Sequence, residues 1–530
     1  MVYVGMPPAV AVNLLKSCPK NMSVDDKAAI VGKEESIDRS LSSHAGHDEH
    51  KGLDDSELPD YQDPEVKKIM RKVDLRLPPV LAVLYLFSFL DRSNIGNAKI
   101  AGMTKTLKMT GHDYNIALTV FFFPYACFMI PSNMVLKKVR PATWMAFLMT
   151  GWGIAMMCHG WVQTKGQLIA CRCIMGLFES GFFPAAAYLC TLWYCRFEYQ
   201  QRVAYFYSSA TLAGAFSGIL AYGLEKLEGK AGYEGWRWIF IVEGIVTIVV
   251  GMSTYWILPN SPQTCTFLNE REKSIIARRL AQDSGTKDGK VINNGDGFRW
   301  PVLRDVLLDK KLWLGGVMVC AQSIPFYAFT FFAPTIIKEL GFKTWKAQLM
   351  TVPVYMVACI GTLVIAYYAD KQHRRWPFVA FPYTLSACAF IAMLAIPHPR
   401  YPGLTYGFLF CIPLGLSSGV NALIAWVGNN LAPSWRRAIG MAFITTLANF
   451  GGAIGANIYL AEQAPKYPLG FGFSLGVLVA GITSAFVMRF LLRKANRERD
   501  NMDPAVVKSE YTEQQLLDLG DKSPLYRYVI

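Results

Sequence analysis

The sequence predicts an all-α membrane protein with twelve transmembrane helices in two pseudo-symmetric six-helix bundles. Three observations predict this fold class: a composition too apolar for a soluble protein, twelve long apolar blocks, and one long polar segment between the sixth and seventh blocks. Of the 530 residues, 52% are hydrophobic and 17% are charged, whereas soluble domains carry about 25% charged residues. The composition therefore excludes soluble multidomain enzymes, coiled coils and disordered proteins.

Each apolar block is long enough to cross a bilayer, which requires about 20 apolar residues per helix. The twelve predicted spans are 74–101, 115–136, 143–163, 168–194, 203–224, 238–258, 312–338, 347–369, 377–396, 403–428, 437–460 and 470–492. The predicted organisation is a disordered cytoplasmic N-terminal tail at 1–70, an N-terminal bundle at 71–258, a cytoplasmic central loop at 259–311, a C-terminal bundle at 312–492 and a cytoplasmic C-terminal tail at 493–530. The tail 1–70 is expected to be disordered because it is mostly polar.

Basic residues flank the apolar blocks and set the expected orientation. The formal net charge of +14 would suggest nucleic acid as a partner for a soluble chain, but these charges lie beside membrane spans, and no nucleic-acid partner is expected. An even number of spans places both termini on one side. Only a cytosolic assignment puts the basic segments before the first span, after the sixth and after the twelfth all inside. We predict a multi-pass plasma-membrane protein with both termini cytoplasmic.

Two features recur after about 235 residues and indicate an internal duplication. Gly214 and Gly218 form a pair that recurs as Gly451 and Gly455, and such pairs allow helices to approach closely in lipid. The basic loop after the second span recurs after the eighth. Two parallel six-helix repeats are the layout of a transporter with the major facilitator fold.

Ionisable side chains inside membrane spans are costly and are therefore functional candidates. Five stand out, namely Asp91, Arg92, Arg172, Glu179 and Glu243. Asp91 and Arg92 diverge by about 100° on a helix, so we expect them to face different neighbours. Arg172 and Glu179 are two turns apart and share a face. If the first and fourth spans meet across a cavity, two acids and two bases converge near the middle of the bilayer.

This set of charges favours co-transport of an anion and a proton. The planar guanidinium of arginine matches the two oxygens of a carboxylate, and a partly dehydrated carboxyl group can carry a proton. The residues about 235 positions after the charged residues of spans one and four are Phe326, Tyr327, Gly407 and Leu414. None of these four is charged, so the residues that bind anion and proton are expected in the first half. The competing interpretation is that the charges only hold helices together, and for Glu243 it is that the side chain braces a loop.

Uncharged polar residues and one charged pair are further candidates. The polar candidates for substrate contact are Tyr85, Gln322, Asn421, Asn449 and Asn457. Tyr85 lies two turns before Arg92 on the same helix face, but each of these side chains could equally bond to another helix. Asp370 and Arg374 lie where the eighth span ends, and we expect them to form a gating clamp between helices.

The sequence contains no coherent catalytic set, and neither an enzyme activity, a cofactor nor a metal is expected. The segment 415–419 matches a hydrolase nucleophile pattern, but that pattern requires a strand–turn–helix setting and here lies in an apolar span. The 12 cysteines lie mostly in apolar blocks and are interpreted as small buried hydrophobic residues. His44, His47 and His50 are interpreted as part of a solvated tail.

Five segments resemble signatures of the anion:cation symporter family of the major facilitator superfamily, most closely those of its fungal allantoate and nicotinate permease branch. The segments are Tyr85–Ala98, Pro131–Lys137, Arg172–Pro184, Trp236–Gly244 and Leu258–Pro262. The resemblance covers about 70–500. One departure is that Leu136 stands where the superfamily usually carries an acid in a basic loop, while Asp370 keeps the acid in the second half.

The resemblance implies roles for four residues. Asp91 and Glu179 would be the proton-coupling carboxylates, Arg92 would contact the anion, and Arg172 would tune Glu179. We therefore expect a monomeric, proton-coupled importer of a small organic anion that works by alternating access in the lipid bilayer. Carboxylates such as nicotinate, allantoate or a related vitamin, ureide or sugar acid are the expected substrates. Two alternatives stay open: proton-driven export of a fungal metabolite, and a nutrient sensor that does not transport.

Overall fold

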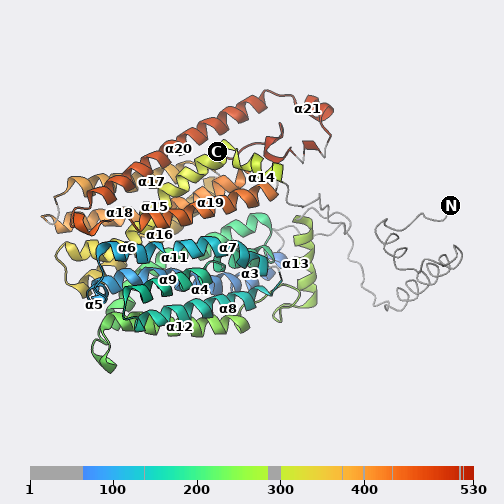
Figure 1. Ribbon diagram of the computed structural model, residues 1–530. Coiled ribbons are helices and arrows are strands. Elements are labelled where there is room, and N and C mark those ends of the chain that lie inside the picture. Colours follow the sequence, from blue (N-terminus) through green and yellow to red (C-terminus); the bar gives the residue numbers. More distant parts are fainter. Residues whose placement is uncertain are drawn as a thin grey trace, which may run out of the picture. The chain divides into compact units, whose positions relative to one another are not determined.

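The computed structural model describes residues 64–136, 138–283, 300–372, 374–397, 400–432, 434–512, 515–516 and 519–530 (Figure 1). The chain divides into two compact units, Met1–Lys67 and Lys68–Ile530. Only the last four residues of the first unit are described, so the predictions for the histidines of the tail lie outside the described residues.

In the described residues of the first half of the second unit, all regular secondary structure is helical. The helices are α3 (Pro64–Asp74), α4 (Leu77–Ile100), α5 (Met103–Thr106), α6 (Gly111–Thr119), α7 (Phe122–Leu136), α8 (Pro141–Cys158), α9 (Lys165–Glu179), α10 (Phe182–Thr191), α11 (Arg196–Glu225) and α12 (Gly235–Ile257), with short 3-10 turns η1 (His159–Trp161) and η2 (Lys230–Gly232). The second and fourth predicted spans are each divided into two helices. Pro124 and Pro184 lie in the first turns of α7 and α10, where a missing N–H costs least.

The described part of the chain begins with α3 at Pro64, so this helix overlaps the segment 1–70 that is predicted to be disordered. Proline is tolerated at the first position of a helix, and Glu65 follows in the first turn, where a negative charge is favourable. Ile69, Met70 and Val73 are buried. Helix α3 therefore includes the last seven residues of that predicted segment.

The second half is also helical wherever it is described. Its helices are α15 (Lys310–Glu339), α16 (Thr344–Gln372), α17 (Pro377–Ala395), α18 (Pro402–Asn429), α19 (Ser434–Gly455) and α20 (Pro468–Asp500), with η3 (Ala461–Gln463). The predicted central loop contains α13 (Glu270–Asp283) and α14 (Trp300–Leu307), and the predicted C-terminal tail contains the last turns of α20, α21 (Pro504–Glu510) and η4 (Gly520–Lys522). The segment 415–419 lies inside α18, so it has no strand–turn–helix setting.

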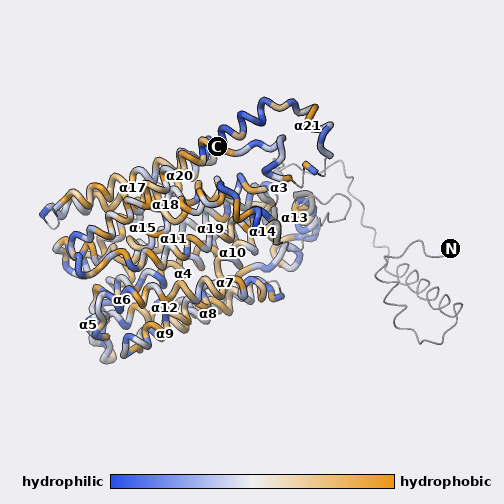
Figure 2. The backbone as a smooth tube through the Cα atoms, turned by 45° about the horizontal axis from the view of Figure 1, so that its top comes forward, coloured by the Kyte–Doolittle hydropathy of each residue, from blue (hydrophilic) through white to orange (hydrophobic). Residues whose placement is uncertain are grey.

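Within the described residues, nine helical segments are long and apolar enough to cross a membrane. Together α8, α11 and α19 fill the remaining three positions of the predicted twelve, and the arrangement is compatible with that number. Large apolar side chains such as Val249 and Met252 on α12, and Phe486 and Phe490 on α20, are exposed. Figure 2 shows hydrophobic residues along the lengths of the helices and hydrophilic residues near their ends, as expected for a surface that faces lipid.

Two ion pairs at equivalent positions in the two halves reflect the internal duplication. Arg202 at the start of α11 binds Asp74 before α4, with Nη2 2.9 Å from Oδ2. Arg436 at the start of α19 binds Asp309 before α15, with Nη2 3.2 Å from Oδ2. Both residues of the second pair follow those of the first by about 235 positions. Each half therefore ties its first helix to its fifth at the same place.

The glycine pairs from which the duplication was predicted permit close approach, but they face different neighbours. A Cβ at Gly218 would strike the carbonyl oxygen of Gln348 on α16, in the other half. A Cβ at Gly455 would lie 2.5 Å from the carbonyl oxygen of Ile324 on α15, in the same half. The two pairs are thus similar in sequence without being equivalent in packing.

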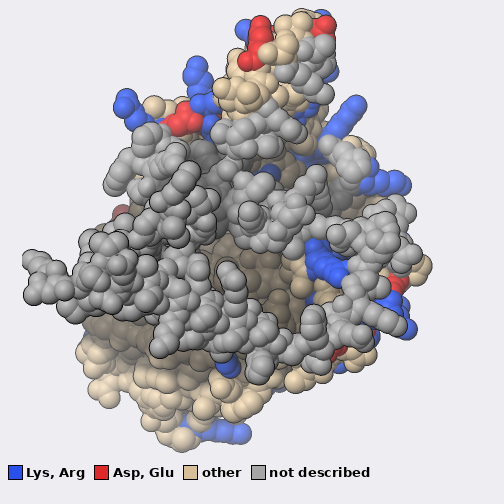
Figure 3. Space-filling view, turned by 90° about the vertical axis from the view of Figure 1, so that its right-hand side faces the viewer, with Lys and Arg blue, Asp and Glu red and all other residues tan. Residues whose placement is uncertain are grey.

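The two halves are joined at one end of the helices. We call the end with α13, α14 and the C-terminal residues the basic end, because Lys and Arg gather there (Figure 3), and the other the opposite end. A Cβ at Gly96 on α4 would lie 2.7 Å from the Phe331 carbonyl oxygen on α15. Near the same end, Asn457 Nδ2 donates to Thr119 Oγ1 over 2.7 Å. These contacts between the halves close the opposite end.

The last residues of the chain pack on the basic end of the second half. Buried Asp521 accepts a hydrogen bond from Lys311, and Trp426 Nε1 donates to the Val529 carbonyl oxygen over 3.0 Å. Lys522 pairs with Asp305 of α14, and this amine lowers the pKa of the Asp305 carboxyl below its usual value. The predicted C-terminal tail therefore ends in a packed segment, 519–530.

Candidate binding site

A cavity of about 80 Å³ lies between the two halves. Its walls come from α4, α7, α9 and α10 of the first half and from α15, α18 and α19 of the second. The polar side chains in its lining are Tyr85, Ser88, Arg92, Tyr125, Glu179, Gln322, Tyr327, Thr445 and Asn449. Five of these, namely Tyr85, Arg92, Glu179, Gln322 and Asn449, were candidates from the sequence.

Arg92 and Glu179 form a buried ion pair at this cavity. Arg92 Nη2 donates to Glu179 Oε1, and the two residues are 4% and 1% exposed. Ser88 Oγ donates to the same oxygen over 2.6 Å. Breaking a buried pair by removing one partner is strongly destabilising, because the other charge is left uncompensated. A negative group beside Arg92 therefore stabilises the buried guanidinium.

Aromatic rings surround the guanidinium of Arg92 and link it to the second half. Its Cζ lies 4.9 Å from the centre of the Phe121 ring and 5.4 Å from that of Tyr125. Arg92 Nη1 donates to Tyr327 Oη over 2.8 Å. Tyr327 is the position that the repeat offset assigns to Arg92, so equivalent residues of the two halves meet. Sequence reasoning named Tyr327 only as a lost charge, and it missed Ser88, one turn before Arg92.

Asp91 faces away from the cavity, into the first half. It is fully buried, accepts from Trp152 Nε1 of α8 over 3.1 Å, and accepts from Thr247 Oγ1 of α12 over 2.9 Å. Its Oδ1 has no hydrogen-bond partner among the described residues. Asp91 and Arg92 therefore have different neighbours, as predicted, but Asp91 does not line the cavity.

Glu243 is a second buried acid next to Asp91. It lies one turn before Thr247 on α12, within electrostatic reach of Asp91. Neither carboxylate oxygen of Glu243 has a hydrogen-bond partner among the described residues. Among the described residues, no hydrogen bond joins Glu243 to a loop. Two carboxylates in a dehydrated site are costly to ionise together.

Arg172 is also buried behind the cavity. It lies on α9 within electrostatic reach of Glu179 and of Tyr114 on α6. Its Nε and Nη2 have no hydrogen-bond partner among the described residues. The expected convergence of two acids and two bases is therefore divided. Arg92 and Glu179 meet at the cavity, while Asp91 and Arg172 lie deeper in the first half.

The remaining candidates fall into two groups. Gln322 and Asn449 line the cavity, whereas Asn421 is absent from its lining although Val420 and Ile424 on the same helix belong to it. The helix turn thus directs Asn421 to a neighbouring face, and the prediction that it contacts substrate is not supported. Asn457 donates a hydrogen bond to Thr119. It therefore bonds to another chain segment, which is the alternative to substrate contact given for these polar residues.

The expected gating pair lies at the basic end. Asp370 is in the last turn of α16, and its side chain is outside the described part of the chain. Arg374 follows α16 and is exposed. The structure therefore places the pair at a helix end, as expected, and the gating role stays a prediction.

A charged cavity between two helical halves that are joined at one end defines a membrane transporter. The chain belongs to the Major Facilitator Superfamily, which residues 81–456 match. This is a family of transporters rather than enzymes. The narrower assignment to the anion:cation symporter family stays a prediction.

Fungal relatives support the same family. The chain is 35% identical to the MFS-type transporter cnsO of Penicillium expansum over 474 residues, which cover 88% of this chain and 90% of the relative. It is 30% identical to the major facilitator-type transporter hxnP of Emericella nidulans, over 89% of this chain and 94% of the relative.

A solved structure shows the same fold. It is the crystal structure of a bacterial homologue of the human lysosomal transporter Spinster, in an inward-facing and occupied conformation. The TM-score is 0.59 at 15% sequence identity, over 81% of this chain and 98% of the other.

Proposed function

We propose that this protein imports a small organic anion together with protons, by alternating access of its two halves. The observation that carries the proposal is the buried Arg92–Glu179 pair in the cavity between the halves. Arg92 offers a planar fork for a carboxylate, and one of its two terminal nitrogens, Nη2, binds Glu179 while the other, Nη1, binds Tyr327. The resemblance to anion:cation symporters supports the same assignment.

The pair suggests how anion and proton are coupled. A proton that binds Glu179 neutralises its carboxylate and weakens the contact with Arg92. The guanidinium then binds the carboxylate of a substrate, so the positive charge of Arg92 stays balanced. Because anion and proton enter together, the site avoids the cost of an uncompensated charge in the membrane. We assign substrate contact to Arg92, Tyr85, Gln322 and Asn449.

Asp91 is proposed as a second proton carrier, acting from behind the cavity. Two observations support this role: Asp91 Oδ1 has no hydrogen-bond partner among the described residues, and the acid Glu243 is a neighbour. Two buried carboxylates are stabilised when they share one proton. Arg172, within electrostatic reach of both Glu179 and Asp91, would set the charge balance of the two acids. On this proposal the first half carries the protons.

Substrate entry requires the cavity to widen. Its present volume of about 80 Å³ is well below the ~300–1,000 Å³ of common ligand pockets. The halves are joined at the opposite end, so we propose that the site opens toward the basic end in this conformation. The topology prediction places that end in the cytosol.

The proposal is tested by uptake into proteoliposomes of radiolabelled carboxylated vitamins, ureides and sugar acids at two external pH values. Accumulation of one of these acids, faster at the lower external pH, is expected for the wild type. Glu179→Gln and Asp91→Asn should remove accumulation against a gradient while leaving the protein folded. If both variants still accumulate the anion, the coupling assignment is wrong. Net efflux in energised vesicles would instead favour the exporter alternative.

A further inference from the structure

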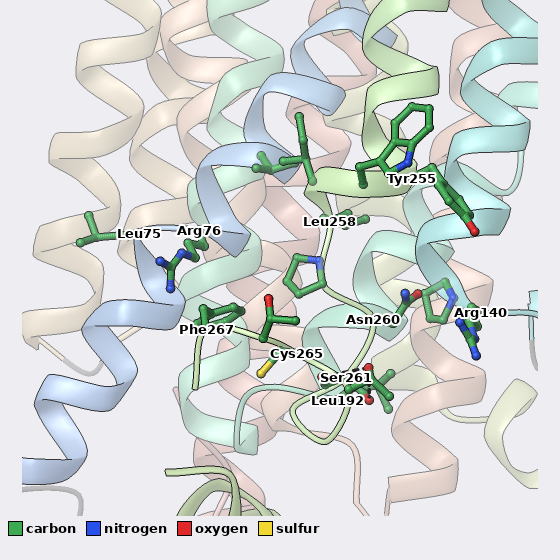
Figure 4. A pocket seen from close by; sticks show the side chains of 17 residues that line it. Leu75, Arg76, Arg140, Leu192, Tyr255, Leu258, Asn260, Ser261, Cys265 and Phe267 are labelled. Carbon is green, nitrogen blue, oxygen red and sulfur yellow. Dashed lines mark hydrogen bonds between the residues drawn. The ribbon is translucent and has the colours of Figure 1, made fainter. Parts of the chain in front are cut away.

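A second, larger cavity of about 800 Å³ lies at the basic end of the first half, away from the site between the halves (Figure 4). It is bounded by the start of α4, the start of α8, the end of α12 and the segment 258–267 that follows α12. Nothing in the proposed transport cycle uses this cavity. Its position and its charges indicate a separate ligand.

Two arginines supply all the formal charge of the cavity lining. Figure 4 shows Arg76 and Arg140 on either side of the segment 258–267. The described lining residues include neither Asp nor Glu, and neither guanidinium forms an ion pair with a described residue. Arg76 packs over the Phe267 ring, 4.4 Å from its centre, which fixes its position. The lining of this cavity is therefore positively charged.

Hydroxyl and amide groups lie between the two arginines. Ser261 and Thr264 share a hydrogen bond of 3.0 Å, and Thr266 also lines the cavity. Asn260 Oδ1 accepts from the Ala142 backbone N–H over 2.9 Å, which ties the segment to the start of α8. Such groups donate hydrogen bonds to phosphate oxygens.

The rim of the cavity lies at the depth of a bilayer surface. Trp256 and Ile257 end the apolar helix α12 and are 74% and 58% exposed, and Leu75 is 69% exposed. Tyr255, in the same lining, is also exposed. Trp and Tyr at the end of a membrane helix mark the headgroup region of the bilayer. A ligand in this cavity can therefore keep acyl chains in the membrane.

We propose that this cavity binds the headgroup of an anionic phospholipid, with Arg76 and Arg140 contacting its phosphate and carboxylate oxygens. The cavity volume is sufficient for a headgroup, and the apolar rim suits the first carbons of the acyl chains. The predicted topology places the basic end in the cytosol, where the membrane leaflet carries anionic lipid. The proposal is independent of the transported substrate.

The test is binding of fluorescent phosphatidylserine to the purified full-length protein, with fluorescent phosphatidylcholine as the neutral comparison. The wild type should prefer phosphatidylserine, and Arg76→Gln with Arg140→Gln should weaken its binding about thirtyfold. Arg76→Lys with Arg140→Lys keeps both charges and should retain most of the binding. Arg493→Gln with Arg497→Gln removes two exposed charges from α20 at the same end and should leave binding unchanged.

Three outcomes would overturn the proposal. One is equal affinity of the wild type for the two lipids. Another is an equal loss in the α20 variant, which would indicate attraction to the basic end in general. The last is displacement of phosphatidylserine by millimolar inorganic phosphate or inositol hexakisphosphate, which would identify the cavity as a site for soluble phosphates.

Discussion

Arg92 connects every part of the proposed chemistry. It binds Glu179 within its own half, it donates to Tyr327 of the other half, and aromatic rings cover its faces. A side chain with these contacts responds both to the charge of Glu179 and to the separation of the halves. The guanidinium is therefore suited to sense substrate and conformation together.

We predict that Arg92→Lys reduces anion affinity by about ten- to a hundredfold. Lysine keeps the charge beside Glu179 but cannot form the forked contact with a carboxylate, and a hydrogen bond to a charged group contributes about 1.5–3 kcal/mol. Binding of the transported acid to the purified variant measures the loss. Unchanged affinity, with the fold intact by thermal unfolding, would show that Arg92 does not contact the anion.

Tyr327→Phe tests the hydrogen bond between Arg92 and Tyr327, which links the two halves. The change removes the acceptor of Arg92 Nη1 and retains the ring. A single hydrogen bond contributes about 0.5–1.5 kcal/mol, so anion affinity should fall about two- to tenfold. Phe122→Leu, which alters a ring packed on Tyr327 without removing a hydrogen bond, serves as the control. A larger effect of Phe122→Leu than of Tyr327→Phe would contradict the role of the hydroxyl.

Sequence reasoning found part of this site and missed the rest for a physical reason. Arg92 and Glu179 are conspicuous because a charge in an apolar span is costly. The partners of Asp91, namely Trp152 and Thr247, are ordinary residues of apolar helices. Their roles depend on how α8 and α12 are rotated about their axes, and no local pattern in the sequence sets that rotation. For the same reason the sequence does not reveal that Asn421 is absent from the cavity lining.

At the scale of helices, close approach at glycine holds the opposite end together. α11 packs on α16 at Gly218, and α4 packs on α15 at Gly96. For α11 the sequence indicated a close approach through Gly214 and Gly218, but the identity of the neighbouring helix comes only from the structure. The sequence shows the twelve apolar blocks, because a helix that spans lipid must be long and apolar. It also shows the duplication and the polar connection between the halves.

We predict that Gly218→Ala favours the conformation that is open at the opposite end. The new Cβ would strike the Gln348 carbonyl oxygen across the two halves, a contact that exists only when this end is closed. Gly476→Ala on α20 is the matched control, because a Cβ there has open space. Accessibility of a cysteine introduced at Thr335, a buried residue near this end of α15, should rise in the Gly218→Ala protein only. Equal accessibility in both proteins would contradict the closing role of this contact.

The packed segment 519–530 should loosen when Asp305 loses its charge. The pKa of Asp305 is lowered by Lys522, so the stabilisation is complete at neutral pH and is lost as pH falls through that lowered value. Asp305→Asn imitates the protonated state at neutral pH and should speed cleavage of the C-terminal segment by protease several-fold. Glu498→Gln on nearby α20, whose carboxylate is exposed, should leave the cleavage rate unchanged. An Asp305→Asn rate equal to that of the wild type would show that the pair does not hold the segment.

At the scale of the whole molecule, two similar halves have unequal roles. Equivalent ion pairs, Asp74–Arg202 and Asp309–Arg436, tie the first helix of each half to its fifth. The buried charges Asp91, Arg92, Arg172, Glu179 and Glu243 all belong to the first half. The second half offers Gln322, Tyr327 and Asn449 to the cavity. We infer that the first half handles protons and anion charge, and that the second half shapes the cavity.

The most direct test of the account is the pH dependence of anion binding to purified wild-type protein and to Glu179→Gln. In the wild type, binding should strengthen as pH falls, because protonation of Glu179 releases Arg92 for the anion. In Glu179→Gln the residue is already neutral, so binding should be tight and should lose most of its pH dependence. The same pH dependence in both proteins would contradict the claim that Glu179 and the anion compete for Arg92.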